Sequence, residues 1–175
     1  MSIYVKKNTI KNTQPLSRLG ILFYIPRIFE IATYPGSVVN TVLFVNPTQF
    51  NNAEDLAKYP RTLEKDSQLL EQLGVHFVFA PSAEEMYSAA EMTETFGFDF
   101  NGLDEVMEGK MRPGHFNGVV QVVSRLFELV RPTRAYFGEK DCQQLAIIRH
   151  MVERSALSSR FQDLKIIGCP LVREK

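Results

Sequence analysis

Hydrophobic positions along the chain alternate between two periods, which predicts strands and helices in turn from residue 38 onward. Val38–Val45 is a near-continuous apolar run rich in β-branched residues, as expected of a strand that is covered on both faces. Val75–Ala80 repeats this pattern. Between the two runs, Thr62–Leu73 places its leucines on or near one face of a helix, and Gly74 follows as a stop signal.

The second half of the chain continues this alternation. The clearest helix is predicted over Phe116–Arg131, because its apolar residues recur at helical spacing and Pro132 follows as a terminator. A short strand is predicted at Ala135–Phe137 and a helix over residues 139–154. Leu164–Val172 has the composition of a last strand.

Two shorter features lie between these elements. Ser82 and Glu85 have the spacing of a capping box, so a short helix is predicted to begin after Pro81. Phe96–Phe100 alternates in polarity, which predicts a strand with one wet face. Strands that alternate with helices indicate an α/β fold with a mainly parallel sheet.

Composition and charge narrow the class of protein. The chain has 175 residues, which is enough for one domain with a sizeable core. Its formal net charge of zero provides no global field, so neither nucleic acid nor a membrane is expected as a partner. Cys142 and Cys169 lack metal-ligand spacing and favour a reducing, cytoplasmic setting. The histidines show no metal-site spacing either, so no metal ligands are predicted.

Residues 1–37 differ from the rest of the chain. Lysine and arginine outnumber acidic residues there, and an apolar stretch, Leu19–Ala32, follows the basic part. This stretch is too short to span a bilayer, and Pro26 and Arg27 interrupt it, so a secretory signal peptide is not expected. We therefore divide the chain into a divergent N-terminal segment, residues 1–37, and a domain over residues 38–175.

Polar residues follow the predicted strands at the edge where parallel sheets bind ligands, beyond the carboxyl ends of the strands. Gly138–Gln144 combines a glycine turn with a helix start, whose free backbone N–H groups suit an anion. Lys140 adds a positive charge, and helical spacing allows it to share one face with Asp141 and Gln144. The segment is either a cradle for a phosphate and a polar substrate or an ordinary solvated helix start.

Two other loops offer polar candidates. The amide of Gln49 can donate to a carboxylate or hydroxyl of a small ligand, or Asn46 and Gln49 can simply satisfy loop backbone groups. Arg112 can bind a phosphate or carboxylate bidentately, although loop arginines are commonly solvated. His115 beside it can contact a ligand or cap the long helix.

Five motifs occur in a specific order along the chain. They are F-V-N-P-T-Q-F at residues 44–50, K-Y-P-R-T-L at 58–63, M-E-G at 107–109, R-P-G-H-F at 112–116 and F-G-E-K-D-C-Q-Q-L at 137–145. The ending G-C-P-L-V-R-E-K fits as well. Over residues 38–175 the chain closely resembles the pantothenate synthetase (pantoate–β-alanine ligase) family. Each motif alone is modest, but five in the right order are highly specific.

The resemblance implies a Rossmann-like nucleotidyltransferase fold, a homodimer and a cytoplasmic enzyme of pantothenate biosynthesis. It implies the ATP-dependent condensation of pantoate with β-alanine, which uses magnesium, passes through a pantoyl adenylate and gives AMP and pyrophosphate. By position, Gln49 and Gln144 resemble two glutamines that bind pantoate, and Gln49 also lies near β-alanine. The positions that resemble the ATP-binding residues are Gly138, Glu139, Lys140, Asp141 and Val172.

Lys140 is the catalytic residue that this resemblance predicts, because a carboxylate that attacks the α-phosphate builds negative charge. Other parts of the family pattern are missing. The family's P-T-M-G-x-L-H-x-G-H segment, whose histidines contact the phosphates, has no counterpart, and residues 1–37 contain no histidine. The D-G-L-A-L-S-S-R-N segment and the C-terminal domain that follow the last strand are also absent, so the domain is expected to be truncated.

These departures leave a second function open. The alternative is an inactive fragment or a non-enzymatic module that binds pantoate or nucleotide. The missing strand and helix also leave part of a sheet face uncovered. We expect the apolar run Ile21–Ile31 to fill part of that gap.

Overall fold

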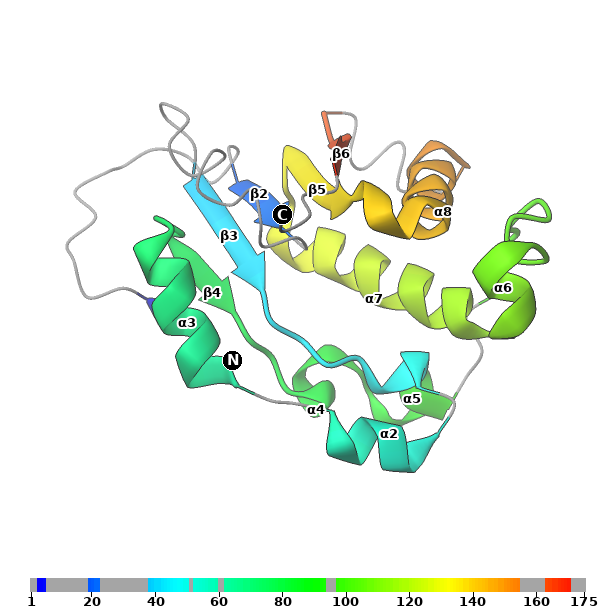
Figure 1. Ribbon diagram of the computed structural model, residues 1–175, viewed down its shortest axis with the longest axis horizontal. Helices are drawn as coiled ribbons and strands as arrows, with labels where there is room; N and C mark the ends of the chain where they lie inside the picture. Colours follow the sequence, from blue (N-terminus) through cyan, green and yellow to red (C-terminus); the bar gives the residue numbers. More distant parts are fainter. Residues whose placement is uncertain are drawn as a thin grey trace, which may run out of the picture.

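The computed structural model describes residues 3–5, 19–22, 38–50, 52–59, 62–93, 97–154 and 163–170. Within these residues a single sheet has the strand order β1-β4-β3-β2-β5-β6 (Figure 1). β1 is antiparallel to β4, and the other neighbouring pairs are parallel. The strands are β1 (Ile3–Val5), β2 (Leu19–Leu22), β3 (Val38–Val42), β4 (Phe77–Phe79), β5 (Arg134–Gly138) and β6 (Lys165–Cys169). The predicted α/β fold with a mainly parallel sheet is confirmed.

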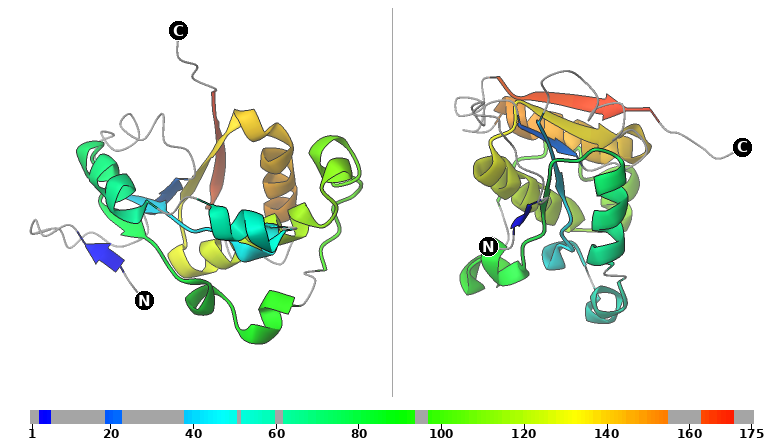
Figure 2. Two further views of the ribbon diagram at one scale, coloured as in Figure 1. Left: turned by 60° about the horizontal axis from the view of Figure 1, so that its bottom comes forward. Right: turned by 90° about the vertical axis from the view of Figure 1, so that its left-hand side faces the viewer.

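Helices connect these strands and cover both faces of the sheet. They are η3 (Pro47–Gln49), α2 (Ala53–Lys58), α3 (Leu63–Gln72), α4 (Ala83–Met86), α5 (Ala89–Thr93), α6 (Met107–Met111), α7 (His115–Val130), η4 (Glu139–Asp141) and α8 (Cys142–Arg154). The right-hand view of Figure 2 shows the strands between α3 on one side and α7 on the other. The capping box of α4 forms as predicted, because Ser82 and Glu85 exchange both hydrogen bonds.

Side chains that alternate along the strands separate two cores. Val39 and Val78 pack with Leu70 of α3 on one face. Val42 and Phe79 belong to the larger core on the other face, which α7 and α8 cover. The apolar stripe predicted for the long helix lies in this larger core, where Val120 and Phe127 are fully buried.

The order of the parallel strands places a switch point at the centre of the sheet. The chain runs from β2 outward through β3 and β4, then returns to the other side of β2 with β5 and β6. Ligands of such sheets bind beyond the carboxyl ends of the strands, near the point where the order reverses. The turn after β3 and the start of α8 therefore lie where a site is expected.

The N-terminal segment contributes two strands that its pattern did not predict. β2, with the sequence Leu-Gly-Ile-Leu, lies between β3 and β5. Short apolar runs do not distinguish strand from helix by periodicity, so this element could not be located from the sequence. Ile21 and Leu22 of the predicted filler belong to β2 itself, and residues 23–31 lie outside the described part of the chain.

The strand predicted at Phe96–Phe100 is wrong for residues 97–100, which form no strand. The alternating aromatic rings serve packing against α8 instead. The ring of Phe98 makes edge contacts with those of Phe100 and His150, with centroids 5.0 and 5.7 Å apart. Phe100 is buried in the larger core. Alternation thus arose from an aromatic cluster and not from strand pairing.

A buried amide attaches the turn after β3 to the first turns of α7. Asn46 is only 4% exposed, and its Nδ2 donates to the carbonyl oxygen of Gly118 at 3.1 Å. Its Oδ1 accepts from the hydroxyl groups of Thr48 and Tyr87, both at 3.1 Å. Burial raises the pKa of the Tyr87 hydroxyl, so this group stays a donor. The polar atoms of Asn46 therefore hold η3 in place.

Gly118 allows η3 to approach this closely. A Cβ at position 118 would lie 2.6 Å from the backbone oxygen of Thr48 and 2.9 Å from its carbonyl carbon. The opposing atoms are backbone, so they cannot move aside as a flexible side chain would.

We expect Gly118→Ala to reduce the free energy of unfolding by about 1–3 kcal/mol, because the added methyl overpacks the contact between α7 and η3. Urea denaturation followed by circular dichroism measures the change. Gly97→Ala is the matched control, since nothing lies within 4 Å of a Cβ at that exposed position. Equal stability of the two variants would contradict the close approach.

We expect Asn46→Asp to reduce the free energy of unfolding by about 1–3 kcal/mol or more. A carboxylate cannot donate to the Gly118 carbonyl, and it places a charge in a buried position. Asn52→Asp makes the same chemical change at the exposed N-cap of α2, where the side-chain oxygen only accepts from Glu54. That control is expected to match the parent in urea denaturation. A similar loss in both variants would show that Asn46 holds nothing specific.

Candidate functional site

A cavity of about 340 Å³ lies beyond the carboxyl end of β3, between the following turn, the region from α6 to the start of α7, and the start of α8. The apolar residues that line it are Phe44, Val45, Phe50 and Tyr59. The polar residues that line it are Asn46, Glu108, Arg112, His115, Asp141 and Gln144. Apolar walls with a few converging polar groups are typical of small-molecule sites.

The cavity brings together residues that lie far apart in the sequence. Five of the predicted site residues line it: Asn46, Arg112, His115, Asp141 and Gln144. Gly138 ends β5, and Glu139 and Lys140 precede Asp141 in η4, but these three do not line the cavity. The structure places Gln49 in η3 without describing its side chain, and Val172 lies outside the described residues.

Arg112 is oriented by an acidic neighbour on the preceding helical turn. Its Nη1 donates to Glu108 Oε1 at 2.7 Å and lies 3.5 Å from His115 Nε2. Both charged side chains are nearly half exposed, so the ion pair itself stabilises the fold by only about 0.2–1 kcal/mol. Its main effect is to hold the guanidinium at the cavity while its other N–H groups remain available to an anion.

His115 is the buried member of this group. Its side chain is 9% exposed, its Nε2 lies 3.9 Å from Glu108 Oε1, and its ring packs against that of Phe116. No side-chain cap is present at the start of α7, where Gly114 adopts a left-handed backbone with φ of 80°. His115 is the first residue of the helix, and it lines the cavity instead of capping from outside.

The opposite wall comes from the start of α8. Asp141 ends η4, and Gln144 lies three residues further on, and both line the cavity as the helical spacing predicted. Lys140, which the same spacing predicted to share this face, does not line it. Glu139 takes another direction: a Cβ on Gly168 of β6 would lie 3.0 Å from its Oε1. The carboxylate of Glu139 therefore lies beside β6.

Sequence reasoning missed two residues of this region. Glu108 belongs to the recognised M-E-G motif, and its spacing of four residues from Arg112 was a usable signal. Gln143 is buried in α8 and binds backbone atoms between residues 103 and 108. No local sequence pattern indicates such a contact.

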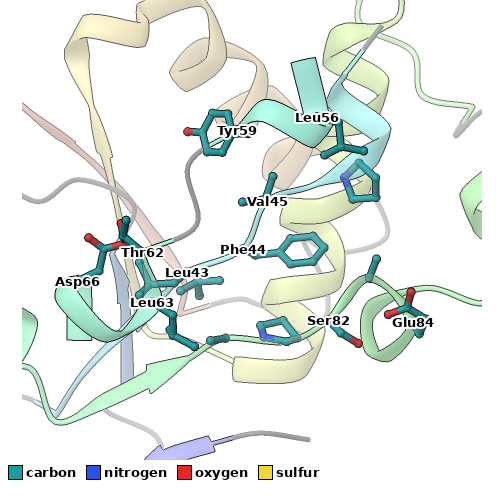
Figure 3. A pocket seen from close by; sticks show the side chains of 15 residues that line it. Leu43, Phe44, Val45, Leu56, Tyr59, Thr62, Leu63, Asp66, Ser82 and Glu84 are labelled. Atoms are coloured by element: carbon teal, nitrogen blue, oxygen red, sulfur yellow. The ribbon is translucent and has the colours of Figure 1, made fainter. Parts of the chain in front are cut away.

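A larger cavity of about 960 Å³ adjoins the first and shares Phe44, Val45 and Tyr59 with it. Figure 3 shows Leu43, Phe44 and Leu56 along its apolar wall, with Asp66 and Glu84 on opposite sides. Its lining residues include no basic or amide side chain, and its two carboxylates do not converge. The smaller cavity has the more varied polar side chains and contains five predicted site residues, so we take it as the candidate site.

Among the described residues, no group of three or more histidine, cysteine, aspartate and glutamate side chains is placed to hold a metal ion. None of the helices that the structure describes is long and apolar enough to cross a membrane.

Comparison with curated proteins identifies the relatives of this chain. It is 61% identical over 144 residues to the pantothenate synthetase of Phocaeicola vulgatus, covering 82% of this chain and 49% of the relative. It is 59% identical over 133 residues to that of Bacteroides fragilis, covering 76% of this chain and 44% of the relative. The chain thus spans about half the length of these curated relatives.

Solved structures agree with the sequence relatives. The pantothenate synthetase of Thermus thermophilus matches with a TM-score of 0.77 and 39% identity, over 93% of this chain and 59% of that one. The pantoate–β-alanine ligase of Francisella tularensis, complexed with β-γ ATP and β-alanine, matches with a TM-score of 0.77 and 33% identity. The match covers 90% of this chain and 60% of that one. The nucleotidyltransferase-type fold is therefore confirmed. The family model described as pantoate–β-alanine ligase matches residues 28–175, and the chain belongs to this family.

Proposed function

We propose that this chain acts as a pantoate–β-alanine ligase, which condenses pantoate with β-alanine at the expense of ATP. The observation that carries the proposal is the 340 Å³ cavity, where Arg112, Asp141 and Gln144 meet at the ligand-binding edge of the sheet. The Francisella tularensis relative supports it, because that protein is complexed with β-γ ATP and β-alanine.

In the proposed reaction a carboxylate oxygen of pantoate attacks the α-phosphate of ATP, and pyrophosphate leaves. The amine of β-alanine then attacks the acyl carbon of the pantoyl adenylate, and AMP leaves as pantothenate forms. Arg112 offers N–H groups to the carboxylate, and Gln144, together with Gln49, orients pantoate for attack. Lys140 stabilises the negative charge that develops on the phosphate.

ATP is assigned to the segment that ends β5 and begins α8. Backbone N–H groups at the start of a helix favour phosphate oxygens, and residues Gly138–Asp141 supply such a start. Val172 is assigned beside the adenine on the family resemblance.

Cys142 and Cys169 are free thiols, which accords with the cytoplasmic location that we also propose.

The residues present fit the magnesium ion that the family implies. Magnesium is usually held by one or two carboxylates together with substrate phosphates, and not by an all-protein cage. The carboxylate of Asp141 lines the cavity next to the proposed phosphate segment and is the residue that would hold the ion. Bound magnesium would neutralise part of the phosphate charge.

One observation favours a second candidate function. Residues 1–37 contain no histidine, whereas the family segment that contacts the phosphates carries histidines. A non-enzymatic module would bind pantoate or ATP without turning them over. Binding and turnover therefore have to be measured separately.

We expect Lys140→Ala to lower the rate of AMP release from ATP, magnesium, pantoate and β-alanine by about 10²–10³-fold, because it removes a cation from the developing charge. Lys165→Ala is the matched control and should retain the parent rate. Lys165 is exposed at the amino end of β6, whereas Lys140 follows the carboxyl end of β5. If the parent releases AMP and Lys140→Ala releases it at the same rate, the role assigned to Lys140 is refuted. Binding of ATP and pantoate without any AMP release would instead establish the binding module.

We expect Arg112→Ala to weaken pantoate binding by roughly tenfold or more, since a hydrogen bond to a charged group is worth about 1.5–3 kcal/mol. Isothermal titration calorimetry with pantoate measures the change. Arg134→Ala is the matched control, because Arg134 is exposed at the amino end of β5. If the parent chain bound neither pantoate nor ATP, both candidate functions would fail.

We also propose that the chain forms a homodimer, as the family resemblance implies. Sedimentation equilibrium is expected to give twice the mass of one chain. A single-chain mass at concentrations where the protein binds its ligands would contradict this.

A further inference from the structure

The buried side chain of Gln143 connects the two walls of the candidate site. Gln143 is the second residue of α8, next to Gln144, but only 7% of its surface is exposed. Its Nε2 donates to the carbonyl oxygens of Leu103 and Val106, both at 2.7 Å. Its Oε1 accepts from the backbone N–H of Glu108 at 2.9 Å. Both amide hydrogens and the carbonyl oxygen are thus used.

The segment that Gln143 binds cannot hold its own conformation by capping. α6 begins after Val106, which has no side-chain acceptor for the free N–H groups of the first turn. Gln143 provides that acceptor from another helix, for the N–H of Glu108. Met107 also has a positive φ of 46°, which is unfavourable for a residue with a side chain and persists only where surrounding contacts hold it.

The same segment positions the cationic wall of the cavity. Glu108 lies in α6, and its carboxylate accepts a hydrogen bond from Arg112, the residue that follows the end of α6. Gln144 and Asp141 on the other wall flank Gln143 in sequence. The distance between the guanidinium on one wall and the amide on the other therefore depends on the hydrogen bonds of Gln143.

We propose that Gln143 is a positioning residue for pantoate, which sets Arg112 against Gln144 by fixing the start of α6 to the start of α8. This inference rests on the proposed function, since it concerns the same site. Gln143 faces the backbone of residues 103–108 and does not line the cavity. Its effect on a ligand is therefore transmitted through Glu108 and Arg112.

The test replaces Gln143 by methionine, which has similar length but neither donates nor accepts as an amide does. Pantoate affinity is measured by calorimetry at a temperature where every variant is folded. We expect Gln143→Met to weaken binding by roughly tenfold to a hundredfold, because a displaced Arg112 loses its charge-assisted hydrogen bond to the carboxylate. Amide hydrogen exchange at Glu108 should accelerate in the same variant.

The control separates positioning from general stability. Leu70→Val creates a defect in the core on the other face of the sheet, away from α6 and α8. It should lower the melting temperature while leaving pantoate affinity unchanged. Equal losses of affinity in both variants, or none in Gln143→Met, would overturn the positioning role.

The amide-exchange measurement distinguishes this inference from the proposed function. If the parent chain does not bind pantoate, the function fails and the substrate role of Gln143 fails with it. Amide exchange at Glu108 still decides whether Gln143 holds α6, since that readout needs no ligand. Unchanged exchange in Gln143→Met would overturn the structural basis even where pantoate binds.

Discussion

The arrangement of the site depends on the amide of Asn46, which is buried against α7. This side chain satisfies the carbonyl of Gly118 with its nitrogen and two hydroxyl donors with its oxygen. A buried amide with these partners fixes a turn in position and orientation, because leaving any partner unpaired is costly. The turn that carries Gln49 is therefore anchored to α7 before any ligand binds.

Polar side chains in and beside the cavity have two different roles. Asn46 and Gln143 have their polar atoms engaged by the protein, and they maintain its geometry. Arg112 and Gln144 face the cavity and provide the groups that a ligand can contact. This separation is what preorganised sites require, since orienting groups work best when other residues hold them.

Five residues that sequence reasoning singled out line one cavity, because part of their placement follows general rules. Asp141 and Gln144 share a cavity because they lie three apart at a helix start. Asn46 lines the same cavity because the loops after parallel strands lie on one side of the sheet. Gln143 could not be predicted, since its partners are backbone atoms 35 to 40 residues away. β2 was missed because its four residues show no period, and the Phe98 region was misread because ring packing imitates alternation.

The central position of β2 has a consequence for how the sheet holds together. In the described sheet, β1, β4 and β3 form one half and β5 and β6 the other, and the four residues of β2 supply the hydrogen bonds between the halves. The turn with Asn46 extends from one half, and the start of α8 extends from the other. Because β2 has only four residues, opening of its pairing with β5 would leave these two parts connected through the packing of α7 against η3 and α8.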